Sequence, residues 1–275
     1  MFVSPMLLQK SDRPFTDDEY ITELKLDGIR LILSKFNGTI RLYTRHHNEV
    51  TSKFPELLQL DIPDGTVLDG EIIVTDLQGK PDFEAMMERF QSSRSEHNIQ
   101  YCVFDIVYYE GEKIRLSLVE RKKILDLVLQ VTETVVKVQW LYGNGEAYFD
   151  LLQKNSLEGI VLKKADSIYK PGTRSQDWLK VINYQYADVL VTGLRKDKFG
   201  LLLAVEEHGK LRPGGVMEFM GPDAREEFYE QYRDYIVEED KKFIFLAPKI
   251  KCRVKFRNYT KAGLLRIPSF VEYIS

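Results

Sequence analysis

The sequence predicts an α+β protein with two domains, a larger one of mixed sheets and helices at residues 1–185 and a small β-barrel at residues 186–275. Strand-like and helix-like stretches alternate up to Val181, whereas short strands with a single helix among them follow Ala187. At 275 residues and 44% hydrophobic content, the chain can build two separate cores.

A β-hairpin is the first element expected, between Glu23 and Arg45. Apolar and polar residues alternate on both sides of Asn37-Gly38, the dipeptide that best supports a two-residue hairpin turn. Lys25 stands near the start of this alternating stretch. We therefore expect Lys25 to open the hairpin.

Two helices are expected next, each preceded by a capping residue. Asp82 stands in front of four apolar residues whose spacing places them on one helical face, namely Phe83, Met86, Met87 and Phe90. Ser117-Leu-Val-Glu120 is a capping box that opens a helix through Leu129. Between the two helices, the apolar, β-rich run from Tyr101 to Tyr108 predicts a buried strand.

The second domain is expected to consist of short strands around one helix. Val189 to Leu194 and Leu201 to Glu206 are predicted strands, and Arg212-Pro-Gly-Gly is a predicted turn. A helix is expected from Ala224 to Val237, with charged residues facing solvent and three aromatic residues facing inward, namely Phe228, Tyr232 and Tyr235. Five short strands with one helix fit a small Greek-key barrel of the oligonucleotide-binding type.

The last part of the chain is basic, although the formal net charge is −3. Seven basic residues and no acidic residue occur between Lys249 and Phe270. Four of them alternate with apolar residues, which would give a strand one basic and one apolar face: Lys251, Arg253, Lys255 and Arg257 against Cys252, Val254 and Phe256. This basic face is either a solvated surface or a track for the phosphates of a nucleic acid.

Composition and the N-terminus predict a soluble cytoplasmic protein with no membrane association, which we expect to be a monomer. No segment approaches the roughly 20 apolar residues of a membrane span, and the N-terminus has no positive region followed by a long apolar run. The two cysteines, Cys102 and Cys252, lie far apart in strand-like segments. They suggest neither a disulfide framework nor a zinc site.

The stretch Glu23-Leu-Lys25-Leu-Asp27-Gly28-Ile-Arg30 sets one lysine beside a carboxylate, a glycine and an arginine. This pattern is typical of a lysine that attacks a nucleotide α-phosphate, which only the neutral amine can do. With a reference pKa of about 10.4, roughly one lysine in 2,500 is neutral at pH 7. We therefore expect burial and nearby cations, with Lys163 and Lys180 as candidates, to lower the pKa of Lys25. Gly28, without a Cβ, is expected to let the backbone approach the ligand.

Four further motifs follow this stretch in order: Leu68-Asp69-Gly70-Glu71, Tyr101-Cys102-Val103-Phe104-Asp105, Leu157-Glu158-Gly159-Ile160-Val161-Leu162-Lys163 and Trp178-Leu179-Lys180. The succession resembles the nucleotidyltransferase motifs of ATP-dependent DNA ligases. The resemblance implies an ATP-grasp-like nucleotidyltransferase (adenylation) domain followed by an OB-fold domain. It also implies sealing of 5′-phosphate, 3′-hydroxyl nicks in double-stranded DNA through a lysine-AMP intermediate and adenylated DNA.

The same resemblance assigns roles to individual residues. It makes Lys25 the nucleophile, Glu23 a group that recognises adenine, and Glu71 the partner of the ribose hydroxyl. It makes Phe104 the ring that stacks on adenine, although Phe104 could equally be a core residue. The remaining nucleotide-binding assignments are basic residues, of which Arg30, Arg174 and Lys180 match positions that engage phosphate: Arg30, Arg45, Lys163, Arg174 and Lys180. Arg45 could also be ordinary surface charge.

A divalent metal ion is expected with ATP. Mg²⁺, or Mn²⁺, neutralises the charge that develops on the leaving pyrophosphate, and it is commonly held by one or two carboxylates with substrate oxygens. The resemblance assigns Glu158 to the metal. Asp27 and Glu71 could complete the site.

Two departures from the family pattern stand out. Many DNA ligases have a second lysine two residues after Lys180, where this chain has Ile182. The segment from Tyr259 to Pro268 resembles the variant C-terminal motif of ligase modules in bacterial end-joining enzymes. By that resemblance Arg266, with Lys261 as second choice, orients pyrophosphate during self-adenylation.

Two other functions remain open. An RNA ligase or an mRNA-capping guanylyltransferase uses the same lysine motif, and the nucleotide that becomes attached, ATP or GTP, distinguishes these enzymes. A nucleic-acid-binding module without activity could retain the fold. The presence of Lys25, Glu71, Glu158 and Lys180 speaks against that module.

Overall fold

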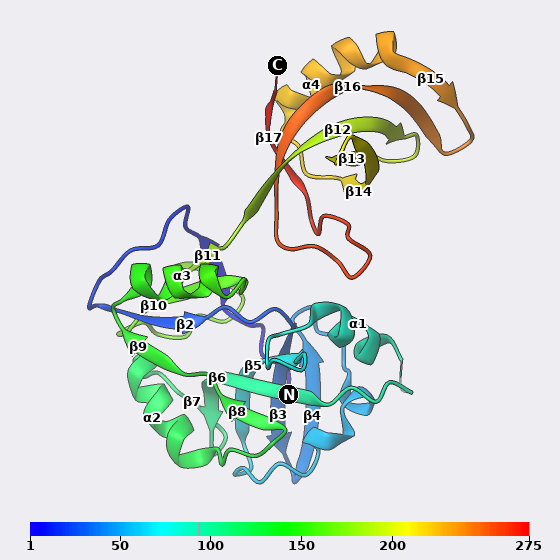
Figure 1. The fold of residues 1–275 in the computed structure, drawn as a ribbon. Coiled ribbons are helices and arrows are strands. Elements are labelled where there is room, and N and C mark those ends of the chain that lie inside the picture. The colour runs from blue at the N-terminus through cyan, green and yellow to red at the C-terminus, as the bar shows by residue number, and fades with distance from the viewer. Residues whose placement is uncertain (93, 275) are drawn as a thin grey trace. The chain divides into compact units, whose positions relative to one another are not determined.

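The computed structural model describes residues 1–92 and 94–274, and the chain divides into two compact units, Met1–Asn183 and Tyr184–Ser275 (Figure 1). The first unit contains two sheets with helices, and the second contains one sheet with a helix. The predicted α+β class is therefore confirmed. None of the helices among the described residues has the length and apolarity of a membrane span.

One sheet of the first unit has five strands in the order β1-β11-β10-β2-β9. Their bounds are β1 Leu7–Lys10, β2 Tyr20–Leu24, β9 Trp140–Tyr142, β10 Gly159–Lys164 and β11 Arg174–Ile182. β1 runs parallel to β11, and the other pairs are antiparallel. Helix α3, Gly145–Lys154, packs on β10 through Phe149 and Leu152.

The other sheet of the first unit has the order β4-β3-β5-β6-β7, with β8 also paired to β6. The strands are β3 Ile29–Phe36, β4 Thr39–Thr44, β5 Thr66–Val74, β6 Ile99–Tyr109, β7 Glu112–Lys113 and β8 Val135–Lys137. Two short 3₁₀ helices, η1 Thr51–Lys53 and η2 Pro55–Leu57, follow β4. Helix α1, Phe83–Gln91, packs on β5, and helix α2, Leu118–Val128, packs on β6.

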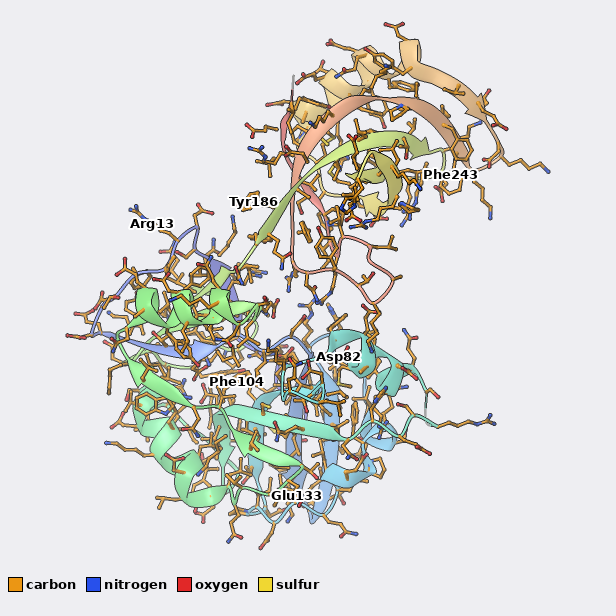
Figure 2. All side chains as sticks on the ribbon, in the orientation of Figure 1. Arg13, Asp82, Phe104, Glu133, Tyr186 and Phe243 are labelled. Carbon is orange, nitrogen blue, oxygen red and sulfur yellow. The ribbon has the colours of Figure 1, made fainter. Side chains whose placement is uncertain are left out.

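The two sheets of the first unit share a core. Ile21 and Trp178 from the five-stranded sheet pack with Ile32, Val67 and Phe104 from the other sheet. Phe104 lies inside the first unit, whereas Arg13 and Glu133 are exposed (Figure 2). The chain crosses between the sheets at the segment that joins β2 to β3.

The hairpin around Asn37-Gly38 is confirmed as β3 and β4, and both turn residues have positive φ (51° and 69°) as a two-residue turn of this kind requires. The expectation that Lys25 opens the hairpin is wrong. Lys25 lies between β2 and β3, which belong to different sheets. Its backbone N–H donates to Gly159 O at 2.9 Å and so extends the pairing of β2 with β10 by one residue.

Both predicted helix starts are confirmed. Asp82 accepts a hydrogen bond from Ala85 N at 2.9 Å in front of α1. The capping box of Ser117 and Glu120 opens α2, which ends at Val128. The predicted buried strand is confirmed as β6.

The second unit is a curled six-stranded sheet in the order β14-β13-β12-β16-β15, with β17 also paired to β16. Its elements are β12 Gln185–Arg195, β13 Leu201–Glu207, β14 Lys210–Met217, α4 Pro222–Gln231, η3 Tyr232–Tyr235, β15 Ile236–Glu239, β16 Phe243–Phe256 and β17 Ser269–Tyr273. The long strands β12 and β16 bend visibly along their length (Figure 1). Phe228 of α4 is fully buried in the core of this unit.

Two expectations for the second unit are wrong. The helix expected to reach Val237 ends at Gln231, because the chain continues as a 3₁₀ turn and then pairs as β15 with β16. The segment Arg212-Pro-Gly-Gly is part of strand β14 and not a turn. β14 is an edge strand of the sheet, where proline is tolerated, and the register between β13 and β14 shifts next to Pro213.

Candidate active site

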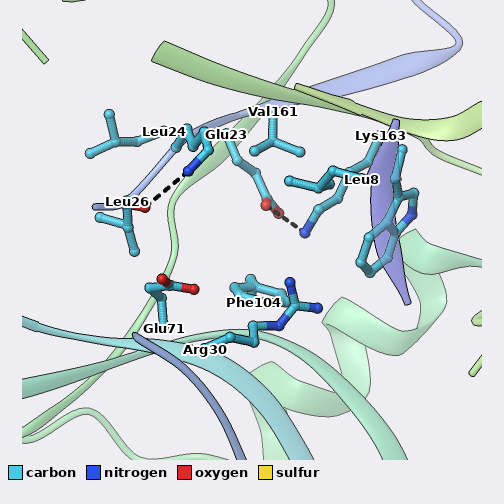
Figure 3. Close-up of a pocket in the computed structure, with 11 residues that line it drawn as sticks. Leu8, Glu23, Leu24, Leu26, Arg30, Glu71, Phe104, Val161 and Lys163 are labelled. Atoms are coloured by element: carbon cyan, nitrogen blue, oxygen red, sulfur yellow. Dashed lines mark hydrogen bonds and ion pairs between the residues drawn. The ribbon is translucent and has the colours of Figure 1, made fainter. Parts of the chain in front are cut away.

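A pocket in the first unit collects six of the residues expected at the active site (Figure 3). They are Glu23, Lys25, Arg30, Glu71, Phe104 and Lys163, and the rest of the lining is apolar: Leu8, Leu24, Leu26, Val161 and Trp178. The charged groups come from β2, β3, β5 and β10 and from the segment between β2 and β3. Residues far apart in the sequence therefore meet where the two sheets face each other.

Lys25 is paired with a carboxylate. Its Nζ donates to Glu158 Oε2 at 2.8 Å, and the two side chains are 17% and 5% exposed. The pairing of β2 with β10 places them together, because Leu24 lies opposite Ile160. Lys25 therefore has a carboxylate partner that was not expected, in addition to the expected cation Lys180, which lies close enough to interact with its charge.

Two glycines let strands of the first unit approach each other closely. A Cβ on Gly159, whose φ is +142°, would lie 2.0 Å from Val181 O of the neighbouring strand β11. A Cβ on Gly28 would lie 2.2 Å from Ile72 O of β5. The structure thus explains Gly28 by its contact with protein backbone, and not by the expected approach to a ligand.

Arg30 is held by a buried carboxylate that the sequence did not single out. Its Nε donates to Asp69 Oδ1 at 2.5 Å and its Nη2 to Asp69 Oδ2 at 2.6 Å. Tyr169 donates its hydroxyl to Asp69 Oδ2 at 2.5 Å and accepts from Met6 N at 3.1 Å. The Arg30 guanidinium lies 4.4 Å from the centroid of the Phe104 ring. Asp69 and Tyr169 thus fix Arg30 in the pocket.

Glu71 lies on the same face of β5 as Asp69, two residues further along the strand. Burial raises the pKa of Glu71 to about 7, and the nearby cations Lys25 and Arg30 offset part of this rise. Glu71 is therefore a weaker acid than a solvent-exposed glutamate.

Glu23 lies at the other end of the pocket between two lysines. Lys163 Nζ is 2.7 Å from Glu23 Oε2, and Lys122 Nζ is 2.5 Å from Glu23 Oε1. Burial acts to raise the pKa of Glu23, but Lys122 and Lys163 outweigh it and the pKa is lowered. Burial lowers the pKa of Lys163 to about 8. The Lys163 ammonium also lies 4.2 Å from the Phe104 ring centroid and 4.3 Å from that of Trp178.

Lys180 lies among basic residues that were expected to contact the nucleotide. Burial lowers its pKa, and four neighbouring cations add to this effect, namely Lys25, Arg174, Arg45 and Lys10. The sequence did not point to Lys10, which lies directly opposite Lys180 in the parallel pair of β1 and β11. Arg174 donates to Leu8 O of β1. This cluster, Lys10, Lys25, Arg45, Arg174 and Lys180, is the lysine-arginine cluster of the first unit.

Several expected site residues are outside the pocket lining. Glu158 is linked to the pocket through Lys25, and Arg45, Arg174 and Lys180 belong to the lysine-arginine cluster. Asp27 does not line the pocket either. Within residues 1–92 and 94–274, no three acidic, histidine or cysteine side chains are grouped to hold a metal ion. The carboxylates present suit Mg²⁺ as hard ligands, but a metal here would also need oxygens of the substrate.

The basic strand of the second unit is confirmed in its pattern. Within β16, Cys252, Val254 and Phe256 are buried, while Lys251 is exposed. Arg253, however, pairs with Asp188 of β12 at 2.9 Å and with Glu272 of β17 at 3.2 Å, which offsets its charge. The Lys255 ammonium lies 5.2 Å from the Tyr184 ring centroid.

Two other predicted residues of the second unit lie beyond β16. The backbone N–H of Arg257 donates to Arg266 O at 3.1 Å, and Arg266 Nη1 donates to Asn258 Oδ1 at 3.3 Å. Both cysteines of the chain are buried and outside any disulfide, as expected, and burial raises the pKa of each thiol to about 12.

Comparison with known proteins identifies relatives of the whole chain. Residues 5–181 match the family described as ATP dependent DNA ligase domain. The chain is 53% identical to the SPbeta prophage-derived DNA ligase-like protein LigB of Bacillus subtilis, over 99% of both chains. It is 28% identical to the multifunctional non-homologous end joining protein LigD of Mycobacterium bovis, over 92% of this chain and 36% of that protein.

A solved structure, described as mycobacterial DNA ligase D complexed with ATP and MES, aligns with a TM-score of 0.62 at 25% identity and covers 99% of this chain and 95% of that one. The chain thus spans nearly all of LigB and of the ligase D structure, and about a third of full-length LigD.

Proposed function

This chain belongs to the ATP-dependent DNA ligase family, and we propose that it seals 5′-phosphate, 3′-hydroxyl nicks in double-stranded DNA through an AMP adduct on Lys25. The observation that carries the proposal is the pocket itself, because one cavity holds an amine, a stacking ring and charged groups that match the parts of ATP. We propose that the protein acts as a monomer in the cytoplasm, where both ATP and DNA are present.

ATP is bound with its base at one end of the pocket and its phosphates at the other. The base stacks on Phe104 beside Glu23, and Glu71 accepts a hydrogen bond from the ribose. The Arg30 guanidinium and the Lys163 ammonium lie 4.4 Å and 4.2 Å from the centroid of the Phe104 ring and therefore border the proposed base site. The lysine-arginine cluster receives the phosphates, since five cations around one point favour a polyanion.

In the first step Lys25 Nζ attacks the α-phosphorus. The N–P bond forms, the bond from the α-phosphorus to the bridging oxygen breaks, and pyrophosphate leaves with the bonding electrons. The Lys25 ammonium must first lose a proton, and Glu158, whose Oε2 is 2.8 Å away, is placed to accept it. Glu158 would also hold Mg²⁺ together with oxygens of the substrate, because Glu158, Glu71 and Asp27 are not grouped as a three-carboxylate site. When bound, Mg²⁺ would neutralise charge on the phosphate oxygens.

In the later steps the AMP moves to DNA. The 5′-phosphate of the nick attacks the Lys25-AMP phosphorus, and the amine leaves. The 3′-hydroxyl then attacks the adenylated 5′-phosphate, which closes the backbone and releases AMP. Arg30 is held beside the pocket by Asp69 in a position to contact phosphate in these steps.

The second unit is proposed to be an OB-fold domain that contacts DNA. Its curled sheet and the basic face of β16, which is exposed at Lys251 and partly exposed at Arg253 and Lys255, support this assignment. Lys251, Lys255 and Arg257 are the proposed phosphate contacts, with Arg253 a weaker one because of its two carboxylate partners. Arg266, or Lys261, is proposed to orient pyrophosphate.

One experiment tests this function. The protein is incubated with ATP labelled on the α-phosphate and Mg²⁺, and nicked duplex DNA is then added. We expect label on the protein, its transfer to DNA, and a sealed strand, with GTP giving no adduct. Label from GTP and not from ATP would favour a capping guanylyltransferase, and sealing of nicked RNA but not DNA would favour an RNA ligase.

A further inference from the structure

Lys122, a lysine of helix α2 with no role in the proposed function, is buried against the base-recognition end of the pocket. Its side chain is 4% exposed, and its Nζ is 2.5 Å from Glu23 Oε1. The same Nζ donates to Phe104 O at 3.1 Å. One ammonium therefore bridges the carboxylate proposed to recognise the base and the backbone of the ring proposed to stack on it.

The neighbouring residues hold this bridge in place. Arg121 and Asp105 form a fully buried pair in which Nε donates to Oδ1 and Nη2 donates to Oδ2, both at 2.8 Å. Arg121 Nη1 also donates to Leu116 O and Ser167 O. Helix α2 and strand β6 are thus joined at two consecutive positions, first by Arg121 with Asp105 and then by Lys122 with Phe104.

Glu23 lines the pocket, although it is only 2% exposed. Each of its oxygens lies beside an ammonium: Oε1 is 2.5 Å from Lys122 Nζ, and Oε2 is 2.7 Å from Lys163 Nζ. These two lysines lower the pKa of Glu23 and so favour its ionised form. An ionised carboxylate can only accept hydrogen bonds. The ligand group that Glu23 recognises is therefore an N–H donor.

We propose that Lys122 is a positioning residue that keeps Glu23 as a fixed, ionised acceptor beside Phe104, and that it thereby sets the preference for a 6-amino purine over a 6-oxo purine. This inference rests on the proposed function of the pocket. The exocyclic amine of adenine donates to Glu23, whereas a 6-oxo group turns a second acceptor towards the carboxylate and is repelled.

Removing Lys122 changes the chemistry that Glu23 presents. Glu23 would keep only Lys163 as a cationic partner. Burial lowers the pKa of Lys163 to about 8. A buried carboxylate with one weakened partner takes up a proton more readily. A protonated Glu23 can donate to a 6-oxo group, and discrimination between the two purine classes is lost.

The test compares ATP with ITP, which carries a 6-oxo purine, in formation of the nucleotide adduct on Lys25. Single-turnover rates are measured by intact-protein mass for the wild type and for Lys122→Met, Lys122→Arg and Lys123→Met. Lys123 is exposed on the same helix and serves as the matched control. The preference for ATP (the ATP to ITP ratio) is the rate constant divided by the apparent Kd for ATP, relative to the same quantity for ITP. We expect this preference to fall by about tenfold or more in Lys122→Met and to recover in part in Lys122→Arg. It should stay unchanged in Lys123→Met.

A double-mutant cycle separates this role from simple packing. In a Glu23→Gln background, Lys122→Met should change the ATP to ITP ratio no further, because Lys122 acts through Glu23. An unchanged ratio in folded Lys122→Met would overturn the inference. If Lys122→Met does not fold, Lys122→Gln, which keeps a donor for Phe104 O but no charge, decides by the same ratio. A wild type that forms no adduct with ATP would instead refute the proposed function.

Discussion

Lys25 Nζ and Glu158 Oε2 lie 2.8 Å apart, so that the proposed nucleophile and a carboxylate form an ion pair at the edge of the pocket. The pair fixes the direction of the Lys25 side chain, and it offers an acceptor for the proton that must leave before the amine can attack. We therefore propose that Glu158 takes part in the first chemical step.

Glu158→Ala should slow adduct formation by about 10²- to 10⁴-fold, the range for loss of a positioned proton acceptor. Stability should fall by about 1–3 kcal/mol, because Glu158 is only 5% exposed and its removal leaves the partly exposed Lys25 ammonium without this carboxylate. Single-turnover labelling and thermal unfolding measure the two effects. Labelling within threefold of the wild type would show that Glu158 does not assist Lys25.

Asp69→Asn should destabilise the first unit by about 3–5 kcal/mol, because it leaves the buried Arg30 guanidinium without its counter-charge. Urea unfolding measures the change. Asp12→Asn is a suitable control, since it weakens the exposed pair of Lys10 and Asp12 and should cost less than about 1 kcal/mol. Equal effects of the two variants would mean that the buried pair contributes no more than a surface pair.

Lys163 should make stability depend on pH between about 8 and 10.5. Burial lowers its pKa in the folded protein from 10.5 to about 8. Between these values the unfolded chain holds a proton that the folded protein has lost, and the free energy of unfolding therefore rises with pH. Below about pH 8 Lys163 is protonated in both the folded and the unfolded state, and the buried charge then destabilises the folded protein to its full extent.

The difference in unfolding free energy between wild type and Lys163→Met isolates this effect. From pH 7.5 to pH 10.5, the unfolding free energy of the wild type should rise relative to that of Lys163→Met by up to about 3 kcal/mol. Lys154→Met, at an exposed position of α3, should show no such slope. A flat difference for Lys163→Met would mean that Lys163 keeps its proton throughout this range.

The basic face of β16 should act on DNA and not on ATP. Replacing both Lys251 and Lys255 with glutamine should flatten the log–log salt dependence of nicked-DNA binding by about two units, one for each lost phosphate contact. Arg253→Gln should change the slope by less than one unit, because Asp188 and Glu272 already offset that charge. Adduct formation with ATP should stay close to wild type in all of these variants. If the salt dependence of the double variant has the wild-type slope, the basic face of β16 is only a solvated surface and does not contact DNA.

Local patterns predicted local structure well. The Asn37-Gly38 turn, the caps at Asp82 and Ser117 and the alternation in β16 each depend on neighbouring residues, and each is confirmed. The motifs also contained six residues that line the pocket.

Contacts between distant segments could not be predicted in this way. Lys25 lies at a crossing between two sheets because β2 pairs with β10, a partner more than a hundred residues away. Asp69 stood inside a recognised motif, but nothing local indicated that it would hold Arg30. Lys122 follows a capping box on a charged helix, where its neighbours give no sign that it is buried. The expected helix to Val237 failed because pairing with β16 outweighs helical periodicity in that segment.

The nucleophile itself provides the most direct test of the account. Intact-mass measurement after incubation with ATP and Mg²⁺ should show one AMP adduct on the wild type. Lys25→Ala should show none, and neither should Lys25→Arg, because a guanidinium stays protonated and cannot attack phosphorus. Both variants should fold like the wild type. An AMP adduct on Lys25→Ala would contradict the account, since the nucleophile would then be another residue.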